Sequence, residues 1–220
     1  MVIALLFALA GCSSTDSNSS SADSNGETTA AASTAQSSKN DVSAADNTAS
    51  GSKTLVVYFS RAGEQYGVGV IEKGNTAIVA DMIAEQTGAD TFEIKPKVDN
   101  YNVSYSELTD IARDEMNSNA RPEIASAVEN FDSYDTVYFG YPIWWGDLPM
   151  ISYTFLESYD FSGKTIIPFC THAGSGDAGT QSKIQSAVPD AEVKEVFAVA
   201  GTDAQNNQDS VKQQIIDWLD

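Results

Sequence analysis

The sequence predicts one doubly wound α/β domain from Lys53 to Asp220, because strand and helix patterns alternate along this part of the chain. The predicted strands are short and rich in β-branched and aromatic residues, with little polar alternation, as in parallel strands buried on both faces. With 220 residues and 42% hydrophobic content, the chain can bury one core of ordinary size.

Two segments precede the predicted domain. Residues 1–12, MVIALLFALAGC, are an apolar run that is too short to span a bilayer and is typical of a secretory signal segment. Its end, Leu9-Ala10-Gly11-Cys12, resembles a bacterial lipobox, in which the cysteine is acylated and becomes the mature N-terminus. The alternative is an ordinary buried helix with an incidental cysteine.

Residues 13–52 are almost entirely Ser, Thr, Ala, Asp, Asn and Gly, which cannot bury enough apolar surface to offset the entropy of ordering. We interpret them as a disordered tether with a root-mean-square reach of roughly 35 Å. The prediction is therefore an extracytoplasmic protein, attached to the cell membrane only through lipid on Cys12.

Five strands are predicted in the domain: Thr54–Phe59, Thr91–Lys95, Asp135–Tyr141, Lys164–Cys170 and Glu192–Ala200. One helix is expected to begin at a cap, Asn75 or Thr76, and to stop at Gly88. Two more are expected over 104–118 and 210–219, where apolar residues recur at helical spacing. In open sheets of this kind, ligands lie beyond the carboxyl ends of the strands, where strand order reverses.

The loop after the first strand ends in Gly74, Asn75 and Thr76, at a predicted helix N-terminus. Unpaired N–H groups and the helix dipole favour an anion there, and Ser60 and Arg61 add a hydroxyl and a cation. The pattern is neither a Walker loop nor a G-x-G-x-x-G fingerprint. A plain helix cap beneath a surface loop would also explain it.

The segment YPIWWGDLPM follows the third strand. Pro142 and Gly146 break regular structure, so we expect a loop in which Trp144 and Trp145, being adjacent, cannot both turn into the core. At least one should line a pocket, where an indole suits a flat heterocycle. Packing of both rings in the core is the alternative.

The segment CTHAGSGDAGT follows the fourth strand and contains the only histidine, His172. Gly174 and Gly176 allow the backbone to approach a ligand closely, and Thr171 and Ser175 offer hydroxyls. We expect His172 to form a structural hydrogen bond in its loop, and donation to the ligand is the alternative. Together, the three loops predict a site for a phosphorylated planar ring.

The motifs VVYFSRAG, EKGNT, NARPEI, YPIWWGDLP and PFCTHAGSG together resemble the flavodoxin-like proteins, in particular a bacterial branch often found as lipoproteins. The resemblance covers residues 53–220 and implies a five-stranded sheet in the order 2-1-3-4-5, with one FMN at the strand carboxyl ends. It implies cofactor-binding roles for Ser60, Arg61, Ala62, Gly74, Asn75, Thr76, Pro142, Ile143, Trp144, Trp145, Gly146, Thr171, His172, Ala173, Gly174, Ser175 and Gly176.

One loop departs from this resemblance. Simple flavodoxins have a short T-x-T-G-x-T phosphate loop, whereas about a dozen residues separate Arg61 from Gly74 here. We expect the extra residues, Glu64–Lys73, either to fold over the cofactor or to form a partner surface.

Three functions are compatible with these features. The net charge of −19 repels nucleic acid and favours a basic partner, which suits an FMN electron carrier between proteins. The alternatives are an FMN-dependent NAD(P)H:quinone or azo reductase and a flavin-free ligand-binding lipoprotein. No metal is expected and no protein side chain is assigned a catalytic role, because the flavin would supply the redox chemistry. We expect Asp147 to lower the flavin potential and Cys170 to pack as a small apolar residue.

Overall fold

The structure of this chain is a computed structural model that describes residues 53–220. The predictions for residues 1–12, for residues 13–52 and for Cys12 lie outside the described residues. Within 53–220, no helix combines the length and the apolar character that a membrane crossing requires. The same residues contain no group of three or more His, Cys, Asp or Glu side chains that could hold a metal ion.

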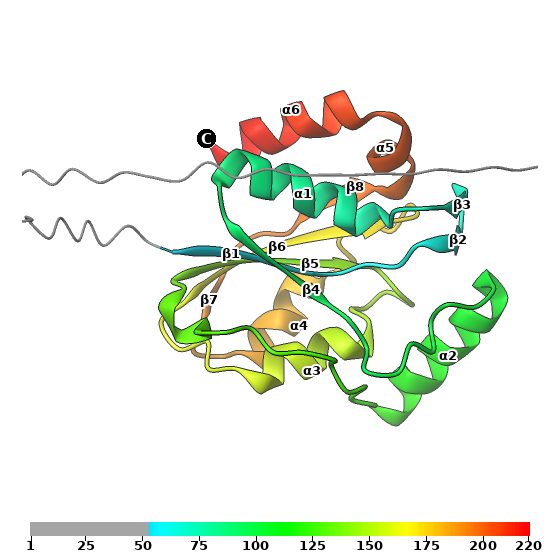
Figure 1. Cartoon of the computed structure of the whole chain (residues 1–220), viewed down its shortest axis with the longest axis horizontal. Coiled ribbons are helices and arrows are strands. Elements are labelled where there is room, and N and C mark those ends of the chain that lie inside the picture. Colours follow the sequence, from blue (N-terminus) through cyan, green and yellow to red (C-terminus); the bar gives the residue numbers. More distant parts are fainter. Residues whose placement is uncertain (1–52) are drawn as a thin grey trace, which may run out of the picture. The chain divides into compact units, whose positions relative to one another are not determined.

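A parallel sheet forms the centre of the fold, with its strands in the order β4, β1, β5, β6 and finally β7 and β8, which both pair with β6 (Figure 1). The strands are β1 (Thr54–Phe59), β4 (Asp90–Ile94), β5 (Thr136–Pro142), β6 (Thr165–His172), β7 (Glu192–Val193) and β8 (Phe197–Ala200). If β7 and β8 are counted as one interrupted strand, this is the predicted order 2-1-3-4-5. The doubly wound α/β prediction is therefore confirmed.

The fifth predicted strand, over 192–200, is wrong in one respect, because it is broken into two pieces. β7 pairs with β6 up to Ile166, and β8 resumes the pairing at Phe169. The gap lies opposite Ile167 and Pro168, and proline has no N–H group to donate to a ladder. The other four strands agree with the prediction to within two residues at each end.

Three helices cover each face of the sheet, with α1, α5 and α6 on one side and α2, α3 and α4 on the other (Figure 1). Their bounds are α1 (Asn75–Thr87), α2 (Tyr105–Ser118), α3 (Met150–Ser158), α4 (Thr180–Ala187), α5 (Gly201–Asn206) and α6 (Gln208–Leu219), and a short 3-10 helix spans Phe131–Ser133. The segments predicted as helices are α1, α2 and α6. The sequence did not single out α3, α4 and α5, since α4 and α5 are too short to show a helical period and α3 follows Pro149 in a segment interpreted as a loop.

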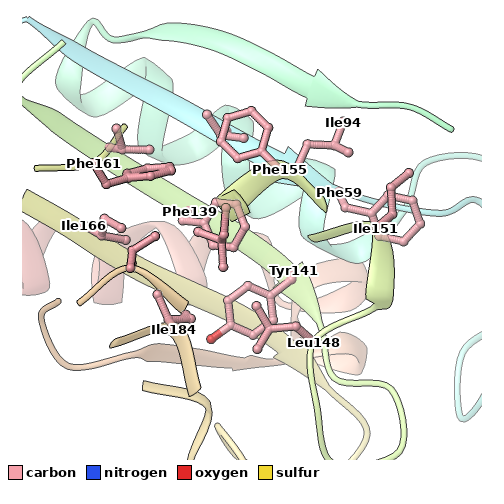
Figure 2. Packing of buried hydrophobic residues seen from close by; sticks show 14 of the residues in the cluster. Phe59, Ile94, Phe139, Tyr141, Leu148, Ile151, Phe155, Phe161, Ile166 and Ile184 are labelled. Carbon is pink, nitrogen blue, oxygen red and sulfur yellow. The ribbon is translucent and has the colours of Figure 1, made fainter. Parts of the chain in front are cut away.

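Neighbouring residues of the central strands point to opposite layers. Val57 and Phe139 pack with α2, α3 and α4, whereas Val56 and Tyr138 pack with α1, α5 and α6. Figure 2 shows the first layer, in which the rings of Phe139 and Phe155 stack with centroids 5.9 Å apart. Because both faces are buried, the strands read as continuous apolar runs, which is why the sequence located them well.

A small hairpin leaves the sheet directly after β1. It consists of β2 (Gly63–Gln65) and β3 (Gly69–Ile71), which pair antiparallel to each other. This hairpin contains most of the residues that lengthen the first loop, and it lies at the carboxyl end of the sheet with the N-terminus of α2 (Figure 1). Its position places it beside the predicted ligand site.

Candidate functional site

A cavity of about 580 Å³ opens at the carboxyl ends of β1, β5, β6 and β8. Of the predicted site residues, it brings together Asn75, Pro142, Ile143, Trp144, Trp145, Thr171, His172, Ala173 and Gly174. The three loops that the sequence singled out therefore meet at one place. Ser60, Arg61, Ala62, Gly74, Thr76, Gly146, Ser175 and Gly176 do not line this cavity.

The N-terminus of α1 borders the cavity and is built around Gly74. We expected Asn75 or Thr76 to be the cap, but the N-cap is Gly74, which has no side chain to close the first turn. Ser60 does this from the end of β1, since its Oγ accepts a hydrogen bond of 3.0 Å from the N–H of Ala77. Among the described residues, no acceptor is present for the N–H groups of Asn75 and Thr76, so both can bind an anion.

A side chain at position 74 would not fit. A Cβ built on Gly74 would lie 2.2 Å from Ser60 Oγ and 2.5 Å from the carbonyl oxygen of Arg61. The glycine is thus required by close approach of two chain segments, and this contact brings the end of β1 against the start of α1.

Thr76 and Asn75 point in different directions from this helix start. Thr76 is buried, and its hydroxyl is 2.8 Å from that of Thr171 at the end of β6. Asn75 lines the cavity, and its Oδ1 accepts a 2.8 Å hydrogen bond from Gln205 Nε2. The first contact joins two of the predicted loops, and the second fixes an amide at the cavity wall.

The Arg61 guanidinium is committed to backbone carbonyls. Its Nε donates to Tyr101 O at 2.7 Å, and its terminal nitrogens donate to the carbonyls of Glu64 and Val103. The sequence showed one of few cations beside a predicted anion site, but the structure places it outside the cavity lining. Here Arg61 fastens the hairpin to the loop before α2, and its contact with a cofactor stays a prediction.

Trp144 and Trp145 have different surroundings, and as expected they do not both turn into the core. The Trp144 ring packs edge-on against Phe59 and Tyr101, with centroids 5.4 Å from each. Trp145 is 49% exposed and forms a wall of the cavity. Its Nε1 donates to Thr109 O at 2.9 Å, and the Arg113 guanidinium lies 4.1 Å from its ring centroid, so the indole is held in place.

The negative charge of Asp147 is paired with the positive charge of Lys183. Its Oδ2 forms a 2.9 Å ion pair with Lys183, and its Oδ1 accepts hydrogen bonds of 2.8 Å from Tyr153 and from its neighbour Leu148. Lys183 also donates to the carbonyl of Gly146. Our expectation that the Asp147 charge acts on a ligand beside the tryptophans therefore has no support in the structure, because the charge is paired and lies outside the cavity lining.

The loop after β6 has the expected structural hydrogen bond. The N–H of Gly174 donates to His172 Nδ1 at 3.0 Å, which leaves Nε2 as the protonated nitrogen of a neutral ring. Burial lowers the pKa of His172, so the neutral form dominates at pH 7. Cys170 is fully buried at the end of β6, and burial raises its pKa to about 12. It packs as a small apolar residue, as predicted.

A model of the flavodoxin family matches residues 53–219. The chain belongs to this family. It is also similar to a candidate flavoprotein from Bacteroides eggerthii, with 30% identity and a TM-score of 0.59, covering 76% of this chain and 97% of that one. A candidate flavoprotein from Bacteroides uniformis has 31% identity and a TM-score of 0.59, covering 76% of this chain and 99% of that one. A flavoprotein from Lactobacillus acidophilus, solved in complex with FMN, is 22% identical, with a TM-score of 0.55 over 72% of this chain and 99% of that one. No curated protein matches.

This flavodoxin domain has cavity residues that sequence reasoning missed: Gln65, Tyr66 and Gly67 from the hairpin, Leu108, Thr109 and Ala112 from α2, and Ala200, Gly201 and Thr202 at the end of β8 and just after it. Ala200, Gly201 and Thr202 could have been predicted from the sequence, because ligands lie beyond the carboxyl ends of the strands and these residues lie at the end of the fifth strand and just after it. The α2 residues had none, since their helix reaches the cavity only through tertiary packing. For the hairpin residues, the sequence indicated only that their loop could fold over a ligand.

Proposed function

We propose that this protein binds FMN in the cavity and carries electrons between proteins. The observation that carries this proposal is the meeting of the α1 N-terminus, the Trp145 wall and the His172–Gly174 backbone at one cavity of about 580 Å³. FMN is the cofactor that the flavodoxin family and the FMN complex of the Lactobacillus acidophilus flavoprotein support.

The residues present fit this cofactor. Asn75 places the start of α1 at the cavity, and the N–H groups of this helix start that are unpaired among residues 53–220 can bind a phosphate without a lysine. The exposed indole of Trp145 offers a face for the ring system. Gly174 also lines the cavity, and it is exposed. When bound, FMN supplies the redox chemistry, and the protein supplies binding, orientation and electrostatics.

His172 would act as a hydrogen-bond donor through Nε2 and not as a general acid or base. Its Nδ1 is occupied by the Gly174 N–H, so the neutral ring keeps its proton on Nε2. Because burial lowers the pKa of His172, this ring adds no positive charge to the site at pH 7. It would therefore not raise the potential of a bound flavin by charge attraction.

The proposed location and partners rest on features of the sequence. We propose that lipid on Cys12 anchors the protein to the outer face of the cell membrane and that residues 13–52 are the tether. The net charge of −19 supports a redox partner with a basic docking surface and disfavours nucleic acid. Membership of a lipoprotein branch of the family is part of this proposal.

The test is the visible spectrum of the purified chain carrying Cys12→Ser, before and after addition of FMN. NADH or NADPH is then added without air, followed by a chemical reductant. Flavin bands that bleach only with the chemical reductant support the electron carrier. Bleaching by the nicotinamide identifies a reductase instead. A colourless protein that takes up no FMN removes both functions and leaves the flavin-free binder.

A further inference from the structure

Within residues 53–220, three of the four exposed large apolar side chains lie in the β2–β3 hairpin or line the cavity beside it. Among the described residues, those with high exposure are Val70 at 82%, Val98 at 68%, Tyr66 at 66% and Trp145 at 49%. Tyr66 lies in the hairpin turn, Val70 lies in β3, and Trp145 shares the cavity with Tyr66. Single exposed apolar residues are common, but a group beside a ligand cavity is typical of an interaction surface.

This hairpin is fixed to the domain rather than loosely attached. Arg61 donates to carbonyls on both sides of the junction, at Glu64 and at Val103. The Glu64 carboxylate accepts a 2.9 Å hydrogen bond from the N–H of Tyr105, the first residue of α2. The rings of Tyr66 and Tyr105 lie 6.0 Å apart. The apolar residues are therefore presented in a defined geometry, which lowers the entropic cost of docking.

A second hollow, a groove of about 690 Å³, lies on the other side of the hairpin, between β3, α1 and the start of α6. Val70 forms its apolar edge, and Ile78 and Met82 lie within it. The hairpin thus separates two hollows: residues 65–67 line the flavodoxin cavity, and residues 70–73 line the groove.

The groove carries excess negative charge. Its two lysines are paired, Lys73 with Asp81 and Lys212 with Glu85 at 2.9 Å. Two further carboxylates of the lining, Glu72 and Asp209, have no ion-pair partner among residues 53–220. An apolar edge beside unbalanced carboxylates is complementary to a surface that presents an apolar side chain among lysines and arginines.

We propose that Val70–Lys73, the end of the hairpin and the two residues after it, together with this groove form the docking site for a basic protein partner. The inference rests on the proposed electron-carrier function, because a partner seated there contacts the hairpin whose turn lines the cavity. A second copy of the chain is a poor occupant, since each copy carries a net charge of −19.

A titration locates the site without depending on flavin. The full chain carrying Cys12→Ser is labelled with ¹⁵N and titrated at low salt with ferricytochrome c, a basic haem protein used as the probe. We expect amide shifts at residues 69–73 and 208–212, which are lost at high salt. Shifts confined to another face, or no shifts at low salt, overturn the proposal.

The second measurement is the rate at which reduced, FMN-loaded protein reduces ferricytochrome c without air. For each fully reduced flavin, two ferric haems gain one electron each and two protons pass to solvent. We expect the double variant Val70→Ser, Glu72→Gln to lower the second-order rate constant about threefold to tenfold at low salt and to flatten its salt dependence. The matched control is Val98→Ser, Glu129→Gln, whose residues line neither hollow and which should keep the wild-type rate.

The outcomes separate this inference from the function on which it rests. Equal rates for wild type and for the hairpin variant overturn the docking site while electron transfer stands. A wild-type protein that takes up no FMN, or that reduces no haem, removes the carrier function, and the titration then decides the docking site by itself.

Discussion

Replacing Gly74 with alanine tests whether the junction of β1 and α1 holds the phosphate. The backbone at Gly74 has φ −64° and ψ 148°, which any residue adopts, so the effect of a methyl group is purely steric. That methyl would lie 2.2 Å from Ser60 Oγ and 2.5 Å from the Arg61 carbonyl oxygen. The serine can rotate away, but the carbonyl belongs to the backbone and must be displaced.

The expected magnitude follows from these two contacts. Rotation of Ser60 deprives the Ala77 N–H of its acceptor, which costs about 1 kcal/mol of unfolding free energy. Displacing the Arg61 backbone costs about 1 to 3 kcal/mol, as for other overpacked sites. Gly74→Ala should therefore lose about 2 to 4 kcal/mol of stability. If one N–H to a phosphate is also misplaced, at about 1.5 to 3 kcal/mol, the Kd for FMN rises at least tenfold.

Urea unfolding of the apoprotein measures the first effect, and a fluorescence titration with FMN measures the second. Gly88→Ala is the matched control, because Gly88 ends the same helix with φ +64° and nothing near its missing side chain. It should cost about 1 kcal/mol from backbone strain alone and leave FMN affinity unchanged. Wild-type stability and wild-type affinity in Gly74→Ala would refute this account of the junction.

Four further outcomes are expected. Trp145→Ala should raise the Kd for FMN about tenfold by removing the ring face, and an unchanged titration would place the flavin elsewhere. Thr76→Val and Thr171→Val should each destabilise the domain, and their double-mutant cycle in urea should give a coupling of about 1 kcal/mol from the shared hydroxyl contact; strict additivity would contradict that contact. Burial lowers the pKa of His172 below its ordinary 6.5, so the folded state binds fewer protons than the unfolded state and loses stability as pH falls below about 6.5. In His172→Gln, the urea midpoint should depend less steeply on pH between pH 7 and 5 than in the wild type. The same pH dependence in both proteins would speak against a partly buried, neutral His172 ring. The Cys170 thiol, fully buried with a pKa near 12, should react with a disulfide reagent at pH 8 only after unfolding, measured in protein whose other cysteine has been replaced.

The sheet could be predicted because burial on both faces leaves a local signature in each strand. Thr54–Phe59 was located without error, and its neighbours were shifted by a residue or two. The break between β7 and β8 could not be predicted in this way. It depends on Pro168 in the adjacent strand, and a pattern along one strand does not show what its partner can donate.

The candidate site could be predicted where the position of a residue depends only on its neighbours in the chain and on the direction of its strand. Two adjacent tryptophans in a loop could not both turn into the core, and the ends of parallel strands had to meet at one edge. Arg61 shows the limit of this reasoning. Its guanidinium donates to the carbonyls of Tyr101 and Val103, about forty residues away, and nothing near Arg61 in the sequence marks those acceptors.

The extra residues of the first loop contain a hairpin pattern that the sequence analysis overlooked, and their two predicted roles do not exclude each other. Two short runs separated by a glycine-containing turn predict a hairpin, and Gly67 and Gly69 have the positive φ that such turns require. The sequence predicts one of two roles for this segment, a cover for the ligand or a surface for a partner. In a hairpin these are compatible, because the turn and the second strand can face different hollows. Tyr66 lines the cavity and Val70 lines the groove, so the same insertion can serve both.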